Sequence, residues 1–187
     1  EPSGITIDEI KAHPEGFQHK PVRYKKYLTE PFKTASGKFD FASKYLKDFG
    51  YPELPEYHSP RYISEPNPEY SYTLVTGARK LVYYHSRNFN FKRFKTAIPT
   101  PEIEMHPLDA IKLGVEDDDL VKVTSAIGSI EIPVKITHDL EILQDVVQIT
   151  HGWQDANVNL ITPDNITDPI DGFPAIKSVE VKVEKVK

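Results

Sequence analysis

Hydrophobic and polar positions alternate with a period of two along much of the second half of the chain. The predicted strands are 72–76, 120–124, 130–136, 146–150 and 179–183. Successive side chains of a β-strand point to opposite faces, so this pattern is typical of strands with one buried face. Pro133 lacks an N–H group, and we expect it at a sheet edge or a crossover. Five or six strands with one or two short helices predict a small barrel.

One short helix is predicted between these strands. It begins at His106-Pro107 and ends before Gly114, because proline is favoured in the first turn of a helix and glycine just past the last. We expect His106 and Asp109 to cap and pack this helix.

The first 68 residues lack the alternation and are rich in proline, lysine and aromatic side chains. Thr6 and Glu9 have the spacing of a capping box, which predicts a helix over about 6–12. A turn is expected at 36–37, and the five prolines of 51–68 predict an extended linker.

A second helical pattern in this region places Phe41, Tyr45 and Phe49 on one face, with Gly50 as the stop. Core packing is the expected role of these rings. The sequence therefore predicts a mixed helix and extended leader over 1–68, which is the tail of a preceding domain, followed by a barrel domain over 69–187.

The composition excludes several kinds of site. The 187 residues include no cysteine, so this chain alone cannot form a disulfide, a zinc–thiolate site, a cysteine-ligated iron–sulfur cluster or a cysteine nucleophile. No apolar run approaches the roughly 20 residues of a membrane helix, so no direct membrane insertion is expected. The net charge of −5 argues against nucleic acid as a partner.

The charges are distributed unevenly along the chain. Residues 73–101 contain no acid, whereas 102–145 contain eleven acids against three lysines. The basic residues of the acid-free stretch are Arg79, Lys80, Arg87, Lys92, Arg93 and Lys95. This stretch is a candidate anion-binding surface, and the alternative interpretation is a solvated basic face.

About ten short motifs follow one another beyond residue 69. They are Leu74-Val-Thr-Gly-Ala-Arg79, Tyr84-His-Ser86, Arg87-Asn88, Pro101-Glu-Ile-Glu-Met-His-Pro-Leu-Asp-Ala110, Leu113-Gly-Val115, Val121-Lys-Val123, Gly128, His151-Gly-Trp153, Asn157, Asn159 and Asp168-Pro169. In their order and spacing they resemble the molybdopterin-dinucleotide-binding domain of the dimethyl sulfoxide reductase family. Gly4-Ile-Thr6, His13-Pro-Glu-Gly16 and Phe32-Lys-Thr-Ala-Ser-Gly-Lys38 resemble the stretch that precedes this domain.

This resemblance implies a mainly β fold, a six-stranded double-psi β-barrel with short helices. It implies molybdopterin guanine dinucleotide as the cofactor, a pyranopterin joined through a diphosphate to guanosine, two copies of which hold molybdenum or tungsten in the whole enzyme. The metal site of that oxidoreductase lies in the remaining domains of the same polypeptide, which are the expected partners. Family analogy adds an iron–sulfur electron-transfer subunit as a candidate partner and the prokaryotic cytoplasm or periplasm as the compartment.

The resemblance also assigns cofactor contacts, and no catalytic residue or metal ligand is expected in this chain. The candidate binding residues are Thr76, Gly77, Arg79, His85, Ser86, Arg87, Asn88, His151, Gly152, Trp153, Asn157, Asn159 and Lys177. Glycine lets a ligand approach the main chain, arginine and lysine donate to phosphate, and amide side chains suit a guanine or pterin edge. Weaker candidates are Asp164, Asp168 and Phe173.

Alternatives stay open for several of these positions. Residues 76–79 could form an ordinary strand-end turn, His85 could be a packed histidine, Trp153 could pack beneath the site, and Lys177 could be solvated. Two loops, at 117–119 and 141–145, lack the glycine usual in the family and are expected to bend differently.

Two other functions compete with cofactor binding. The barrel could be a protein-interaction module without a cofactor. A free-standing metallohydrolase would use His85, His106 and His151, although their separations match no local metal motif.

Overall fold

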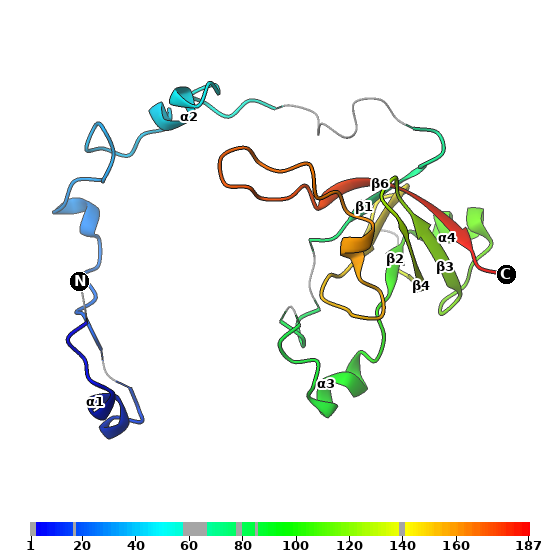
Figure 1. Ribbon diagram of the computed structural model, residues 1–187, viewed down its shortest axis with the longest axis horizontal. Coiled ribbons are helices and arrows are strands. Elements are labelled where there is room, and N and C mark those ends of the chain that lie inside the picture. The colour runs from blue at the N-terminus through cyan, green and yellow to red at the C-terminus, as the bar shows by residue number, and fades with distance from the viewer. Residues whose placement is uncertain (1–2, 17, 58–66, 78–79, 85, 139–140) are drawn as a thin grey trace. The chain divides into compact units, whose positions relative to one another are not determined.

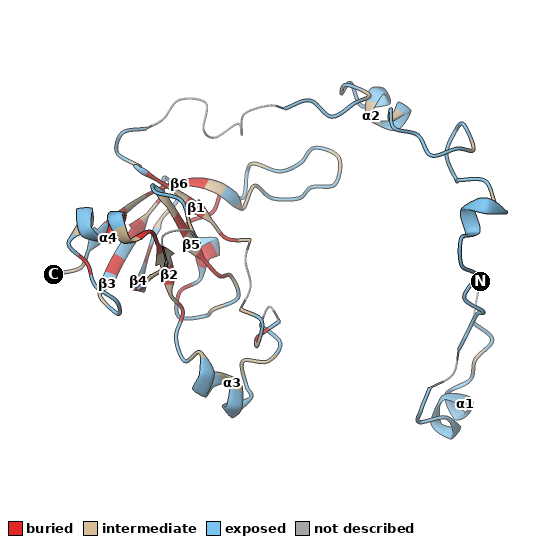
Figure 2. Cartoon of the chain, turned by 180° about the vertical axis from the view of Figure 1, so that it is seen from behind, coloured by how far each residue is buried: buried red, intermediate tan, exposed pale blue. Residues whose placement is uncertain are grey.

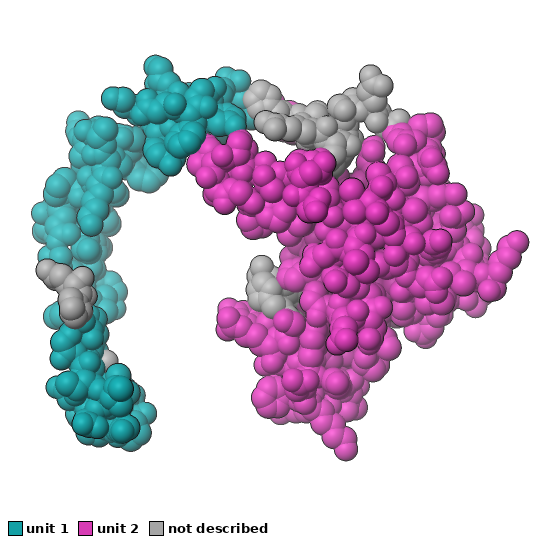
Figure 3. Space-filling view, viewed as in Figure 1, with its two compact units in different colours: residues 1–56 teal, residues 57–187 magenta. Residues whose placement is uncertain are grey.

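A computed structural model describes residues 3–16, 18–57, 67–77, 80–84, 86–138 and 141–187. The chain divides into two compact units, Glu1–Glu56 and Tyr57–Lys187 (Figure 3). The division falls inside the proline-rich stretch 51–68 that is predicted to be a linker.

Unit 2 contains six strands that close into a barrel (Figure 1). The strands are β1 Tyr72–Val75, β2 Ile103–Met105, β3 Leu120–Thr124, β4 Ser129–Ile136, β5 Val146–Ile149 and β6 Lys177–Lys185. Around the barrel they follow the order β1-β5-β2-β4-β3-β6. The β1–β5 and β2–β4 pairs are parallel and the other pairs are antiparallel. The predicted mainly β, double-psi barrel is thus confirmed.

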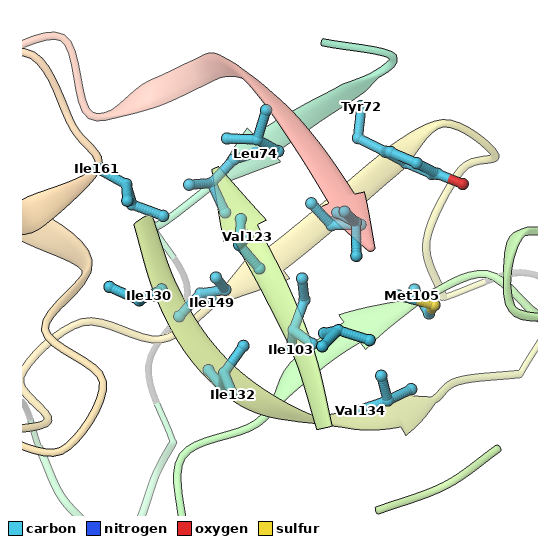
Figure 4. Packing of buried hydrophobic residues seen from close by; sticks show 14 of the residues in the cluster. Tyr72, Leu74, Ile103, Met105, Val123, Ile130, Ile132, Val134, Ile149 and Ile161 are labelled. Atoms are coloured by element: carbon cyan, nitrogen blue, oxygen red, sulfur yellow. The ribbon is translucent and has the colours of Figure 1, made fainter. Parts of the chain in front are cut away.

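The barrel interior is a filled hydrophobic core. Alternate strand residues point inward, as in β4, where Ile130, Ile132 and Val134 are buried and their neighbours are more exposed (Figure 4). Each fully buried aliphatic side chain contributes roughly 1.5–3 kcal/mol to stability. Because side chains fill the interior, a ligand of this barrel must bind at an end or on the outside.

Pro133 lies where β4 changes partners. Residues 129–133 of β4 pair with β3, and pairing with β2 begins at Val134. The missing N–H of proline therefore falls at the end of the β3 ladder, one residue before the pairing with β2 begins.

Helix α4, Pro107–Leu113, begins and ends as predicted. His106 Nδ1 accepts a hydrogen bond from the Leu108 N–H, and Gly114 ends the helix in the left-handed conformation. The fully buried Asp109 carboxylate accepts from Lys112 Nζ at 2.9 Å and from the Asp145 N–H at 2.7 Å. The capping and packing roles predicted for His106 and Asp109 are confirmed.

The two ends of the barrel differ. The long-loop end carries the carboxyl ends of β1, β3 and β5 and the β1–β2, β3–β4 and β5–β6 connections. Helix α3, Lys92–Ala97, and the 3-10 helix η2, Val158–Leu160, belong to these connections. The opposite end, called the α4 end, carries α4 and the β4–β5 connection (Figure 1). The candidate binding residues that the structure describes all belong to the long-loop end.

The two loops without the family's glycine belong to the α4 end. Asp118 has a φ of 68° and Asp145 a φ of 59°, both in the left-handed region that glycine favours. Aspartate is among the few other residues that tolerate this conformation. Each of these loops therefore has an aspartate in the left-handed conformation that glycine adopts most easily.

Unit 1 contains short elements, which are α1 Ile7–Ala12, the 3-10 helix η1 Lys26–Leu28 and α2 Lys44–Asp48. The predicted capping box of Thr6 and Glu9 is present, and Gly37 turns the chain with a φ of 70°. No described residue of 3–57 is buried, as Figure 2 shows by its colours. Phe41, Tyr45 and Phe49 are exposed, so the prediction that they pack in a core is wrong within this unit.

Helix α2 is shorter than the predicted pattern because the Ser43 side chain caps it by accepting from the Leu46 N–H. None of the helices in the described part of the chain has the length and apolar character needed to cross a membrane.

Candidate functional site

Three segments that are far apart in the sequence meet at the long-loop end. Parallel pairing of β1 with β5 brings their carboxyl ends together, and β6 begins beside the end of β1. His151 Nδ1 lies 3.0 Å from the Thr76 carbonyl oxygen, and the Thr76 hydroxyl donates to the Ile176 oxygen at 2.6 Å. Thr76 is 1% exposed. Its main-chain oxygen and its hydroxyl therefore join the three segments, and the hydroxyl is used within the fold.

Gly77 and Lys177 are in direct contact. A Cβ atom added to Gly77 would lie 2.7 Å from Lys177 Cε, so the lysine side chain packs directly against Gly77, which has no side chain of its own. A β-bulge produces this contact, because Leu74 pairs with Val179 while Val75 pairs with Lys177. The extra residue, Ser178, has a φ of 62°. The bulge therefore sets an exposed cation across the end of β1.

Trp153 packs in an aromatic cluster with Tyr83 and Phe89. The Trp153 ring lies 4.7 Å from the Phe89 ring and 5.3 Å from the Tyr83 ring, and the latter two are 4.4 Å apart. Trp153 is half-buried. These contacts tie the β5–β6 connection to the β1–β2 connection, and they leave part of the indole on the surface.

The Ser86-Arg87-Asn88 segment divides into exposed and internal groups. Ser86 and Arg87 are exposed, and the Arg87 guanidinium lies 5.5 Å from the centre of the Tyr84 ring. Asn88 Nδ2 donates to the Val82 oxygen at 3.0 Å, so this amide organises the loop. Arg87 and Ser86 are the better placed to contact a ligand.

Among the predicted residues of the β5–β6 connection, Gly152, Asn157 and Asn159 are exposed, whereas His151 and Trp153 are half-buried. Gly152 has a φ of 100°, a backbone conformation that glycine allows. Asn157 Oδ1 accepts from the Asn159 N–H and caps η2, which leaves its Nδ2 group and the Asn159 side chain at the surface. This short helix packs closely on the β3–β4 turn, because a Cβ on Gly128 would lie 2.6 Å from the Leu160 oxygen.

Five further predicted residues have different outcomes. Arg79 and His85 lie outside the described residues. Asp168 accepts hydrogen bonds from two N–H groups of its own turn, so it has ordinary turn chemistry. Asp164 and Phe173 are exposed.

Lys80 belongs to the acid-free stretch, but two glutamates of the following segment neutralise its charge. Its Nζ lies 2.5 Å from Glu104 and 3.3 Å from Glu102, and Gln148 donates to Glu104. Burial lowers the pKa of Lys80, but the two carboxylates outweigh this effect and leave the pKa raised. The predicted anion-binding surface therefore does not include Lys80.

Among the described residues, the exposed cations of the long-loop end are Arg87, Lys92, Arg93, Lys95 and Lys177. Sequence reasoning missed the Lys80 network and the roles of Tyr83 and Phe89. The pair of glutamates directly after an acid-free run was the available signal for the network. The two aromatic residues have no periodic pattern that could have identified them.

His106 and His151 do not share a metal site. His106 caps α4 at one end of the barrel, and His151 lies at the other. Among the residues that the structure describes, no group of three histidine, aspartate or glutamate side chains could hold a metal ion. The metallohydrolase interpretation is therefore wrong for His106 and His151.

The groups that meet at the long-loop end suit an anionic, heteroaromatic ligand. Ammonium and guanidinium groups pair with phosphate, and exposed amides and glycine main chain suit the edge of a ring system. Gly77 is a position where any side chain would have to displace Lys177. The fold and the geometry thus define a β-barrel domain with a candidate binding site in the loops of one end.

Comparison with known proteins identifies the family. Residues 72–180 match the molydopterin dinucleotide binding domain, and the chain belongs to this family. It is 26% identical to dopamine dehydroxylase of Eggerthella lenta over 155 residues, which are 72% of this chain and 15% of that protein. It is 33% identical to a formate dehydrogenase alpha subunit of Methanocaldococcus jannaschii over 123 residues, 65% of this chain and 18% of that protein.

The solved structure of acetylene hydratase from Pelobacter acetylenicus matches in fold. The TM-score is 0.73 at 22% sequence identity, over 88% of this chain and 28% of that chain. The chain thus spans between 15% and 18% of the length of the two curated relatives named above.

Proposed function

We propose that this chain binds the guanine dinucleotide form of molybdopterin with the long-loop end of its barrel. The observation that carries the proposal is the meeting of Gly77, His151 and Lys177, from three separate segments, at one end of the barrel. The family match supports a molybdopterin dinucleotide as the ligand.

Different residues would contact different parts of the ligand. Lys177 and Arg87 would pair with the diphosphate, because both are exposed cations at this end. Asn157 and Asn159 would read the guanine or pterin edge by hydrogen bonds, and Gly77 would let the ligand approach the main chain. When bound, the cofactor pair supplies the redox chemistry of its molybdenum or tungsten. The chain's own residues bind and orient the ligand, and none transfers a proton or an electron.

The parent protein in this proposal is an oxidoreductase whose metal site lies in other domains. Residues 1–68 would be the tail of the preceding domain, and those domains would cover its exposed rings. This agrees with the lack of any buried residue among the described residues of 3–57. The probable oxidoreductase YoaE of Bacillus subtilis aligns over 89% of this chain, more than the barrel unit alone. An iron–sulfur subunit is a further proposed partner.

Titration of the isotopically labelled chain with GDP, followed by NMR, tests the proposal. GDP carries the guanosine and diphosphate half of the ligand, and ATP at matched ionic strength is the control. This chain would form only one wall of a site between domains, so its binding free energy should be about 3–5 kcal/mol, which corresponds to roughly millimolar dissociation constants. We expect saturable shifts confined to the long-loop end, in 76–98, in 151–159 and at Lys177, that are stronger with GDP.

Three variants sharpen this test. Arg87→Ala and Lys177→Ala should weaken GDP binding, whereas Lys122→Ala, an exposed lysine on the outside of β3, should not. Diffuse, salt-sensitive shifts that are equal for both nucleotides would indicate only a basic surface. No shifts at several millimolar would favour the protein-interaction module.

A further inference from the structure

Tyr83 connects the two long loops of the long-loop end. Its ring contacts the Phe89 ring and the Trp153 ring. Its hydroxyl lies within hydrogen-bonding distance of the main-chain oxygens of Phe94, at 3.1 Å, and Ile98, and these two oxygens share its single proton. Tyr83 is 2% exposed. One buried side chain therefore contacts the β5–β6 connection with its ring and the end of α3 with its hydroxyl.

Helix α3 has few other means of holding its position. It is six residues long, buries none of its side chains and has no side-chain hydrogen bond at its N-cap. Helices of this length are not stable alone in water, and the carbonyl groups of a last turn need donors. The Tyr83 hydroxyl is such a donor. Burial raises the pKa of Tyr83, so the hydroxyl keeps its proton at neutral pH.

Helix α3 carries cations of the proposed site. Lys92, Arg93 and Lys95 are exposed on it. Their place relative to the His151-Gly-Trp153 turn depends on the link that Tyr83 makes. We infer that Tyr83 is a positioning residue of the ligand site, because its ring holds the Trp153 turn and its hydroxyl holds the basic helix. This inference rests on the proposed function.

Two substitutions separate the ring from the hydroxyl. Tyr83→Phe keeps the ring contacts and removes the hydrogen bonds, and Tyr83→Leu removes both. Tyr72→Phe is the matched control, since Tyr72 is a buried tyrosine at the amino-terminal end of β1. Trp153 is the only tryptophan in the chain, so its fluorescence reports directly on the aromatic cluster. Amide hydrogen exchange over 94–98 reports on the end of α3, and GDP titration reports on the site.

In Tyr83→Phe we expect unchanged Trp153 emission, roughly tenfold faster exchange over 94–98, and GDP binding that is weaker by a similar factor. Tyr83→Leu should in addition shift the emission. Tyr72→Phe should leave all three measurements unchanged.

Each other result would overturn the inference. Exchange and GDP affinity equal to those of the unsubstituted chain would mean that the hydroxyl does not hold α3. Faster exchange with unchanged GDP affinity would mean that Tyr83 stabilises a loop without positioning the site. If the unsubstituted chain showed no saturable GDP shifts, the proposed function would fail first. Exchange and fluorescence would then still decide whether Tyr83 couples the two loops.

Discussion

Gly77 and Gly128 each leave no room for a side chain, but Gly77 lies against a lysine side chain and Gly128 against main chain. Substitution by alanine should therefore affect binding at Gly77 and stability at Gly128. A Cβ on Gly128 would lie 2.6 Å from the main-chain oxygen of Leu160, and a Cβ on Gly77 would lie 2.7 Å from Lys177 Cε. Both distances are shorter than real Cβ contacts, so a neighbour must move. The lysine side chain can rotate away, whereas the η2 main chain cannot move without disturbing its packing.

The magnitudes follow from this difference. Overpacking against the main chain costs about 1–3 kcal/mol, and the reduced freedom of the unfolded chain offsets about 0.4–1 kcal/mol. Gly128→Ala should therefore lower the free energy of unfolding by about 1–2 kcal/mol. Gly77→Ala should change it by less than about 0.5 kcal/mol. Its effect should instead appear in binding, because Lys177 leaves its place at the end of β1.

Urea unfolding followed by Trp153 fluorescence measures the first effect. With an m-value of about 2 kcal/mol per molar urea, the midpoint should fall by roughly 0.5–1 M in Gly128→Ala and stay nearly constant in Gly77→Ala. GDP titration measures the second effect, and Gly77→Ala should bind more weakly. Equal losses of midpoint in the two variants would refute the reasoning, as would unchanged GDP binding by Gly77→Ala.

Three further predictions concern the α4 end. Asp118→Gly should stabilise the barrel by about 0.5–1 kcal/mol, because the left-handed conformation at Asp118 is costly for a residue with a Cβ. An unchanged or lower urea midpoint would contradict this expectation. Asp109→Ala removes the buried acceptor of two hydrogen bonds and should cost roughly 1–3 kcal/mol in the same assay, with Asp109→Asn intermediate. A main-chain N–H bond lowers the pKa of Asp117, and the Lys185 ammonium lowers that of Asp119, both below the ordinary 3.8. Their stabilisation is therefore complete above about pH 3.8 and is lost as the pH falls through the folded values. A urea midpoint that declined equally below that pH in the unsubstituted chain and in Asp117→Asn/Asp119→Asn would show that these carboxylates are not responsible.

The strands could be predicted because the barrel interior is apolar and every second residue faces it. The prediction of 120–124 matches β3, and that of 130–136 differs from β4 by one residue. The missed strand, β2, has three residues, which are too few to show a period. Pairing with β4 and β5 on its two sides, which is a tertiary effect, makes it a strand.

The site could be predicted only as a set of separate motifs. Thr76 and His151 are 75 residues apart and meet only through the pairing of β1 with β5. The bulge at Ser178 has no signal in the sequence, because serine seldom adopts a positive φ. Nor does any local pattern reveal that Tyr83 donates to the end of α3. Motifs can name the residue types of a site, whereas closure of the barrel decides which of them meet.

The filled barrel also explains why the candidate residues lie where they do. Inward positions are occupied by the core, so a strand can contribute to binding only through the residues that follow or precede it. Gly77 and His151 follow strands, and Lys177 begins one at a bulge. Lys177 pairs with Val75 in the ladder, Gly77 and His151 lie two residues beyond paired strands, and all three are exposed or half-buried. A site built in this way is as rigid as the ends of the strands, and only the parts farther along the loops, such as α3, need a separate support.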